Sequence, residues 1–436
     1  MVHFKIQDVT FAYPDTTGRP ALEHINLEIR QGEYVTVCGA SGSGKTTLLR
    51  LLKSVLTPHG TLSGEILFCG RPLQEADLRE QSSKIGYVMQ NPDSQIVTDK
   101  VWHELAFGLE SLGYDQKTIR LRVAEMASYF GIEHWFYKNV AELSGGQKQL
   151  LNLASVMAMQ PEVLILDEPT SQLDPIAAAD FLNTVKKINR ELRTTVIITE
   201  HRLEDIFYAS DQVVVMEKGK IAAVDTPRAI GAFLKEGDHE MFAALPTPLL
   251  VYYGVEEQKN PAPLTVREGA EWLDTLFTDR TLKVSAYEAE APYEEDEIKD
   301  PAVEVKELYM RYEKNAPDIL KGVSFRVEKG TLFAIVGGNG TGKSTLLKSI
   351  CGICHPYSGK VKILGKRMEK YRRGELFSGN LAMLPQDPLS LFVKKTVRED
   401  LEEMITGKNK KDREDEITQI AKLCQITELL EKHPYD

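Results

Sequence analysis

Near the N-terminus, apolar and polar residues alternate in two short runs, HFKIQDV from His3 and INLEI from Ile25. A period of two is typical of strands with one solvated face, so we expect these runs to pair in a small antiparallel side sheet. Further along, continuous apolar runs alternate with helical patterns; these runs are YVTVCG, KIGYVMQ, VLILDE, TTVIITE and QVVVMEKG. Such a pattern predicts an α/β fold with a mainly parallel sheet that is covered on both faces.

The chain contains an internal repeat. The segment YVTVCGASGSGKTTLLRLL matches the later segment TLFAIVGGNGTGKSTLLKSI, and each reads as an apolar strand, a glycine loop and an apolar helix. The match extends upstream, where Tyr13 aligns with Tyr312, and downstream, where Gln90 aligns with Gln386. Agreement over so long a stretch indicates two duplicated domains.

The repeat predicts a first domain over residues 1–235 and a second over residues 301–436, with a linker over 236–300. The linker contains PTPLL, NPAPL and the acidic run YEAEAPYEEDEIKD. Prolines and acidic residues of this kind are typical of a linker with a poorly ordered end. Within it, we expect one short helix at Val266–Phe277.

Composition narrows the possible functions. Apolar residues make up 42% and charged residues 27% of the chain, which is ordinary for a globular protein. No window approaches the roughly 18 consecutive apolar residues of a membrane span, and the N-terminus lacks the pattern of a signal peptide. A membrane role would therefore depend on a partner. The net charge of −11 argues against a general nucleic-acid binder, so we expect no nucleic-acid partner.

The five cysteines are an odd number, which suggests reduced thiols in the cytoplasm. Cys351 and Cys354 form a CxxC pair, but neither a second pair nor a histidine cluster accompanies it. We interpret both cysteines as small packing residues after a helix.

Both glycine loops fit the phosphate-binding pattern GxxxxGK[ST]. Glycines let successive backbone N–H groups surround phosphate oxygens at the start of a helix. Lys45 should reach the β- and γ-phosphates of a nucleotide, and the Thr46 hydroxyl should bind Mg²⁺. A chance match is negligible when the pattern occurs twice in the same context. The predicted phosphate-binding residues are Gly39, Ser41, Gly42, Gly44, Lys45, Thr46 and Thr47 in the first loop, and Gly337, Asn339, Gly340, Gly342, Lys343, Ser344 and Thr345 in the second.

The apolar run VLILDEPT ends in two carboxylates. Asp167 is placed to hold Mg²⁺ through water, and Glu168, one residue later, is placed to polarise an attacking water. An acidic turn after a buried strand is the structural alternative, and the preceding phosphate loop favours the catalytic interpretation.

With these motifs in order, the first repeat resembles the ATP-binding-cassette (ABC) ATPases over nearly its whole length. The resemblance implies two P-loop ABC cassettes, each with a mainly parallel core, an antiparallel side sheet and a helical subdomain, the second cassette being incomplete. It also implies ATP hydrolysis with Mg²⁺ as the metal. The family signature is matched by LSGGQ, in which Ser144, Gly145, Gly146 and Gln147 would hold the γ-phosphate of ATP bound to an opposing cassette.

The resemblance assigns further roles. His201 would be the switch histidine that contacts the γ-phosphate, and Gln90 the Q-loop glutamine that senses Mg²⁺ and links to transmembrane partners. Tyr13 would stack on adenine. In the second cassette, Tyr312 would bind nucleotide, and Ser344 and Gln386 would contact both nucleotide and metal. The run SQLD before Pro175 resembles the D-loop.

A narrower resemblance is to the ATPases of energy-coupling-factor transporters, which take up vitamins, vitamin precursors or metal ions. The runs that carry it are QNPDSQIVTDKVWHELAFGLE, EPTSQLDP, ITEHRLED and LPQDPLSLFVKKTVREDL. It implies transmembrane transporter subunits and a membrane component that captures the substrate as partners, with the ATPase on the cytoplasmic face of the membrane. Two alternatives remain open: a soluble two-cassette ATPase that acts on ribosomes or DNA, and an exporter ATPase. The acidic, proline-containing linker favours transport over the first.

Two cassettes of this family close head to tail, so each ATP site combines the phosphate loop of one with the signature of the other. The second repeat reaches Asp436, which aligns with Glu142, immediately before LSGGQ. We therefore expect this chain to be part of a longer protein, although a natural short form is possible. A complete site would need the second cassette of the same chain or another copy.

Overall fold

The computed structural model describes residues 1–14, 19–255, 261–278, 300–338, 340–372, 374–386, 388–405 and 410–435. Two compact units divide the chain, one comprising Met1–Ala289 and the other most of Glu290–Asp436. Among the described residues, no helix is long and apolar enough to cross a membrane.

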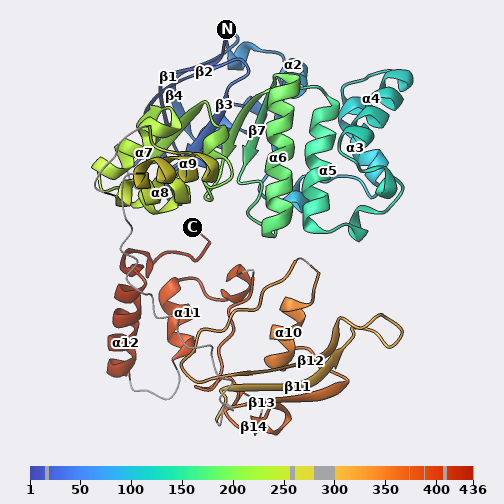
Figure 1. Ribbon diagram of the computed structural model, residues 1–436, viewed down its shortest axis with the longest axis vertical. Helices are drawn as coiled ribbons and strands as arrows, with labels where there is room; N and C mark the ends of the chain where they lie inside the picture. Colours follow the sequence, from blue (N-terminus) through green and yellow to red (C-terminus); the bar gives the residue numbers. More distant parts are fainter. Residues whose placement is uncertain are drawn as a thin grey trace. The chain divides into compact units, whose positions relative to one another are not determined.

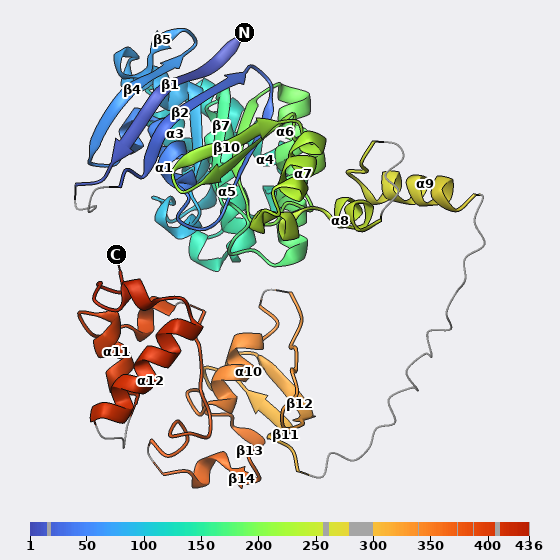
Figure 2. The same cartoon turned by 90° about the vertical axis from the view of Figure 1, so that its left-hand side faces the viewer.

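The N-terminal strands form the predicted antiparallel side sheet of the first unit (Figure 2). Its order is β2 (Leu22–Arg30), β1 (Val2–Ala12), β4 (Thr61–Phe68) and β5 (Arg71–Pro72). From Ile25 onward, every second residue of β2 turns inward, which places Ile25, Leu27 and Ile29 in the core. The alternating pattern of the sequence is thereby explained.

A second sheet of six strands forms the centre of this unit. Its order is β10 (Lys220–Asp225), β9 (Gln212–Glu217), β3 (Tyr34–Cys38), β8 (Thr195–Thr199), β7 (Val163–Asp167) and β6 (Ile85–Val88). All neighbouring strands are parallel except β10, which is antiparallel to β9. In β7, Leu164 and Leu166 face one apolar cluster while Val163 and Ile165 face the other. The predicted parallel sheet, covered on both faces, is confirmed here.

Helices cover this sheet and extend beyond it (Figure 1). Helices α3, α4 and α5 pack on one another and form the predicted helical subdomain beside the sheet. The α-helices between residues 45 and 236 are α1 (Lys45–Leu51), α2 (Leu78–Lys84), α3 (Val101–Ser111), α4 (Gln116–Tyr129), α5 (Gly145–Ala158), α6 (Pro175–Leu192) and α7 (Pro227–Glu236).

Part of the predicted linker is folded. Helix α8 (Thr247–Gly254) follows α7, and α9 spans Val266–Phe277, as expected from the sequence. The Tyr252 and Trp272 rings lie 5.2 Å apart, and both residues belong to the apolar core of the first unit. The described residues between 236 and 278 therefore pack with the first unit, because their apolar side chains have a core to join. Most of the acidic run lies outside the described residues.

The second unit contains a four-stranded antiparallel sheet with the same strand arrangement as the first side sheet. Its order is β12 (Leu320–Val327), β11 (Val303–Met310), β13 (Ser358–Ile363) and β14 (Lys366–Arg367). Helix α10 (Lys343–Ile350) packs with it through Leu346 and Ile350, and α11 (Val397–Met404) and α12 (Lys410–Leu423) follow. Cys351 caps α10, and Cys354 packs against the same apolar cluster, which agrees with a packing role.

The strand predicted before the second glycine loop does not form. Residues 331–336 carry no strand, and Leu332 and Val336 are 102% and 88% exposed. In the first unit, the equivalent β3 is hydrogen-bonded between β8 and β9. The described part of the second unit contains no strand equivalent to β8 or β9, so this segment has no partner and the expected parallel core is absent there.

Candidate nucleotide site

The first phosphate loop joins β3 to α1, and its glycines have conformations that other residues rarely adopt. Gly39 has φ 150° and Gly44 has φ 99°. A Cβ on Gly39 would lie 2.2 Å from the Met216 carbonyl oxygen, and one on Gly44 would lie 2.7 Å from the Ala21 carbonyl oxygen. Both positions therefore require glycine for steric and conformational reasons.

Lys45 is the first residue of α1, and its side chain curls back over the loop. Its Nζ donates hydrogen bonds to the carbonyl oxygens of Gly39 (2.9 Å) and Ala40 (3.0 Å). Burial lowers the pKa of Lys45, while the nearby Glu168 and Asp167 carboxylates act in the opposite direction. The ammonium group is thus held in the concave face of the loop, where a nucleotide phosphate would bind.

Asp167 ends β7 and faces the first residues of α1. Its Oδ1 accepts hydrogen bonds from the hydroxyls of Thr46 (3.0 Å) and Thr199 (3.1 Å), and its Oδ2 accepts one from Tyr87 (3.2 Å). Hydroxyl and carboxylate oxygens are the donors that Mg²⁺ prefers. The donor set formed by Thr46 and Asp167 therefore fits Mg²⁺, as the sequence predicts.

Glu168 follows directly and is held from two sides. Its Oε1 lies 2.8 Å from His201 Nε2, and its Oε2 accepts a hydrogen bond from Gln90 Nε2 at 2.9 Å. Its backbone has φ 44°, and its N–H donates to Thr199 Oγ1 at 2.9 Å. The structure thus brings together three residues that the sequence analysis placed in the catalytic site.

Tyr13 lies on the other side of the loop. Its hydroxyl is 3.1 Å from Thr47 Oγ1, and its half-buried ring packs edge-on against Phe11, with centroids 5.0 Å apart. Ser41 and Gly42 are exposed at the loop tip. Adenine stacking on Tyr13 stays a prediction.

The signature segment begins α5. Exposed Ser144 is the N-cap, its Oγ accepting from the Gln147 N–H (3.3 Å) while Gln147 Oε1 accepts from the Ser144 N–H (2.9 Å). Gly146 lies against α6, since a Cβ there would be 3.1 Å from Ala177 Cβ. Binding of the γ-phosphate of an opposing cassette by Ser144 stays a prediction. Gly145, beside it, is half-buried.

The second glycine loop repeats the geometry of the first. Gly337, Gly340 and Gly342 have φ 155°, 80° and 92°, close to the 150°, 77° and 99° of the first loop. Lys343 Nζ donates to the Gly337 carbonyl at 2.7 Å, and Tyr312 OH lies 3.1 Å from Thr345 Oγ1. The two copies therefore share their side-chain contacts as well as their sequence.

Three other residues predicted for the second site are either exposed or outside the described residues. Ser344 and Gln386 are exposed, and Gln386 lies in a segment without regular secondary structure. Asn339 lies outside the described residues. Roles for these residues in binding nucleotide or metal remain predictions.

Sequence reasoning overlooked three polar residues around the site. Thr199 and Tyr87 both hydrogen-bond Asp167. Glu200 accepts from the N–H and hydroxyl of Thr170 at 3.0 and 2.7 Å, and burial raises its pKa to about 7. Thr199 ends β8, which lies parallel beside β7, and the sequence does not reveal this pairing.

A lysine-bearing glycine loop after β3, two carboxylates at the end of β7 and a histidine beyond β8 define a P-loop nucleotide-hydrolase site. The family model described as ABC transporter matches residues 22–171 and 320–436. The chain belongs to the ABC transporter family as an ATP-binding protein, and it is an ABC ATPase with two cassette-type repeats.

Relatives support this assignment over the whole chain. An ABC transporter ATP-binding protein of Bacillus cereus is 36% identical, covering 100% of this chain and 77% of the relative. One from Methanosarcina acetivorans is 34% identical, covering 89% of this chain and 65% of the relative. The solved structure of cbiO1 from Clostridium perfringens, described as part of an ABC transporter complex, is 32% identical. The match covers 53% of this chain and 91% of that chain, with a TM-score of 0.49.

Proposed function

We propose that this ATPase powers a membrane importer for a vitamin, a vitamin precursor or a metal ion. The observation that carries the coupling to a membrane partner is a surface groove next to the segment that bears Gln90. The groove has a volume of about 580 Å³ and is lined by α2, α3, α5 and the residues Gln95 and Val97. Because Gln90 contacts Glu168, this segment connects the groove to the catalytic carboxylate.

The groove offers an apolar surface to a partner. Leu78, Val97 and Phe107 line it and are 59%, 65% and 38% exposed. Gln95, in its wall, donates to the Tyr87 carbonyl (3.1 Å) and accepts from the Met89 N–H (2.8 Å). A short helix from a transmembrane subunit would bury this apolar surface, and its movement would be passed to the strand end that carries Gln90.

Each residue of the site would have its own role in ATP hydrolysis. Lys45 would stabilise the charge on the transferred phosphoryl group, while Thr46 and Asp167 would hold Mg²⁺, which neutralises phosphate charge. Glu168, oriented by His201, would position the attacking water. Ser144 would bind the γ-phosphate across the interface with an opposing cassette, so that hydrolysis would release the two cassettes.

Direction and cargo rest on the resemblance of the QNPDSQ and ITEHRLED runs to energy-coupling-factor ATPases. Under this proposal, a separate membrane component captures the substrate, and the ATPase works at the cytoplasmic face of the membrane. The partners are then transmembrane subunits rather than nucleic acid.

The proposal is tested with membranes and reconstituted vesicles. Phe107→Glu should abolish co-sedimentation with transporter-containing membranes but keep ATP binding, whereas Leu121→Glu, on an exposed position of α4 outside the groove, should keep both. Retained membrane association in Phe107→Glu would remove the groove from the proposal.

Direction is tested in vesicles whose purified transporter has its ATPase on the outside. ATP should move labelled vitamin, precursor or metal ion from the lumen to the ATPase side, and Glu168→Gln should stop this movement. ATP-driven movement into the lumen would identify an exporter instead.

A further inference from the structure

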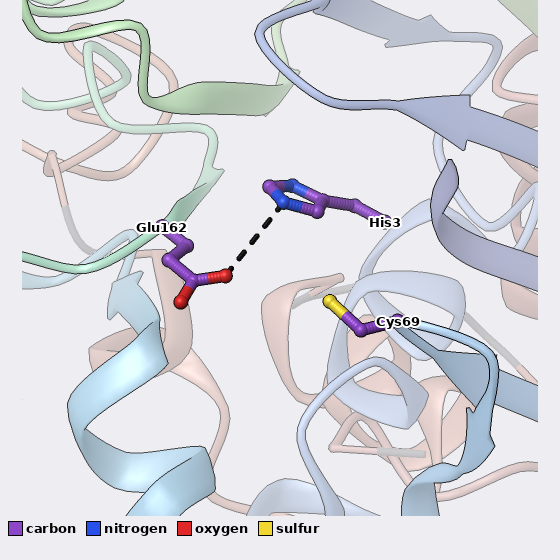
Figure 3. Close-up of side chains that lie close together, drawn as sticks. All are labelled: His3, Cys69 and Glu162. Atoms are coloured by element: carbon purple, nitrogen blue, oxygen red, sulfur yellow. Dashed lines mark ion pairs between the residues drawn. The ribbon is translucent and has the colours of Figure 1, made fainter. Parts of the chain in front are cut away.

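Outside the nucleotide site, the first unit brings together a histidine, a cysteine and a carboxylate (Figure 3). His3 Nε2 lies 3.7 Å from Glu162 Oε2, and one ligand atom from each of His3, Cys69 and Glu162 lies within 4.8 Å of the other two. In Figure 3 the three side chains converge from three separate segments. His3 is 2% exposed, whereas Cys69 is exposed.

Backbone hydrogen bonds fix this arrangement. His3 is in β1, and its carbonyl oxygen accepts from the Cys69 N–H at 2.8 Å, directly after β4. Glu162 immediately precedes β7; its N–H donates to the Lys84 carbonyl (2.9 Å) and its carbonyl accepts from the Thr195 N–H (3.0 Å). The cluster therefore connects the antiparallel side sheet to the edge of the parallel sheet.

Thr195 orients the histidine ring. Its Oγ1 lies 2.8 Å from His3 Nδ1 and also accepts the Gly32 N–H at 2.8 Å. When Nδ1 carries the proton and donates it to Thr195, the lone pair of Nε2 faces Glu162 and Cys69. Metal-binding histidines are oriented in this way by a hydrogen bond to the second ring nitrogen. Burial lowers the pKa of His3, while the Glu162 carboxylate acts in the opposite direction.

The charges around the three side chains would balance those of a doubly charged metal ion. Glu162 uses different oxygens for its two contacts, Oε1 for Lys84 at 3.3 Å and Oε2 for His3. Lys84 also pairs with Glu80 at 3.0 Å, so its positive charge is balanced independently. Burial raises the pKa of the Cys69 thiol, but a bound metal ion would deprotonate it, and the thiolate and carboxylate would together neutralise two positive charges.

We propose that His3, Cys69 and Glu162 bind one Zn²⁺ ion. Nitrogen, thiolate and carboxylate form a donor set for a borderline-soft metal, whereas the hydroxyl and carboxylate oxygens near the phosphate loop suit Mg²⁺. A cavity of about 580 Å³ lies beside Cys69, lined also by Glu80 and Lys84. Water or a small anion from this cavity would supply the fourth ligand. The ion would clamp the two sheets together.

The test uses nucleotide-free full-length chain titrated with Co²⁺, which reports a thiolate ligand by a charge-transfer absorption band. One equivalent of Co²⁺ should produce the band, and Zn²⁺ should remove it. Cys69→Ser should abolish the band, whereas Cys424→Ser, which changes an exposed cysteine of the other unit, should leave it unchanged. Thr195→Val should weaken Co²⁺ binding by about 10- to 100-fold, as expected for the loss of an orienting contact.

Each outcome decides the proposal. Absence of the band in the wild type, or its persistence in Cys69→Ser, would overturn it. If Cys69→Ser does not fold, as judged by circular dichroism, His3→Gln and Glu162→Gln provide the same readout. A wild-type spectrum in both of these variants would equally reject the site.

Discussion

Glu168 is contacted by residues from two different segments, and this shapes the chemistry of the site. His201 approaches one carboxylate oxygen and Gln90 the other, at 2.8 and 2.9 Å. Since Gln90 lies at the end of β6 and His201 beyond β8, a shift of either segment moves the carboxylate that would position water. The contributions of His201 and Gln90 to hydrolysis can therefore be tested by substitution.

Lys45→Ala should weaken MgATP binding at the first phosphate loop. The variant loses a charge-assisted contact worth about 1.5–3 kcal/mol, or roughly 10- to 150-fold in affinity. Titration of a fluorescent ATP analogue measures the effect, in a background where Lys343→Ala silences the second loop. Lys117→Ala, on an exposed position of α4, is the matched control and should bind normally. Equal affinities in the two variants would contradict the role of Lys45.

Glu200 should make stability depend on pH. Burial raises its pKa from an ordinary value of 4.5 to about 7, so the folded protein holds this proton more tightly than the unfolded chain. The protonated Glu200 therefore stabilises the folded protein at low pH. This contribution to the free energy of unfolding is lost as pH rises from about 4.5 through about 7. Glu200→Gln keeps an oxygen acceptor for Thr170 and cannot ionise.

The melting temperature of Glu200→Gln, relative to wild type, should accordingly rise between pH 5 and pH 8. Exposed Glu125→Gln serves as the control and should show no such trend. A pH-independent difference between Glu200→Gln and wild type would show that Glu200 does not titrate in this range.

Residues at fixed offsets from a motif could be predicted from the sequence, whereas residues defined by strand neighbours could not. Lys45 and Glu168 follow directly from a glycine loop and a strand end. Tyr87 was missed because nothing in the sequence reveals that β6 lies beside β7. The cluster of His3, Cys69 and Glu162 was missed for the same reason, since three distant segments meet there.

At the level of elements, α5 is tied to the segment that carries Gln90. Asn152 Nδ2 donates to the Pro92 carbonyl at 3.1 Å, Gln149 Nε2 donates to the Met89 carbonyl at 3.1 Å, and Lys148 pairs with Asp93 at 2.6 Å. We expect a shift of the Gln90 segment to move the helix that begins with the signature. The sequence placed both motifs but could not show that their neighbouring residues are in contact.

These contacts should differ in their energetic contribution. Asn152 is fully buried, so Asn152→Ala should lower the free energy of unfolding by about 1–2 kcal/mol, partly offset because its Oδ1 has no partner among the described residues. Lys148→Ala removes a pair whose Asp93 is 65% exposed, and it should cost about 1 kcal/mol or less. Urea denaturation followed by fluorescence compares the two variants, and the reverse order would contradict this ranking of the two contacts.

The segments before the two glycine loops show that a local sequence pattern does not by itself determine whether a strand forms. The apolar segments that lead into the two glycine loops look alike, yet only β3 forms a strand. A strand needs hydrogen-bonding partners, and β3 has β8 and β9 on its two sides. The loop that follows has similar glycine φ angles and the same lysine-to-carbonyl hydrogen bond in both units, although only the first follows a strand.

At the scale of the whole molecule, two phosphate loops are present, but LSGGQ occurs once in the printed sequence. In the proposed head-to-tail arrangement, each ATP site would combine a phosphate loop from one cassette with a signature from another. A second copy of the first cassette would supply such a signature to the first loop. Bound ATP would then bridge two molecules.

We therefore predict that this polypeptide hydrolyses ATP slowly at low concentration, with a rate that rises as the square of protein concentration. Ser144→Arg should abolish this activity, because the arginine side chain would fill the space needed by the γ-phosphate of the ATP held by the facing molecule. Ser128→Arg, on an exposed position of α4, introduces the same charge away from the signature and should behave like wild type. Phosphate release measured across a dilution series distinguishes the cases. A rate strictly proportional to concentration, or full activity in Ser144→Arg, would show that hydrolysis does not require a signature from a facing cassette.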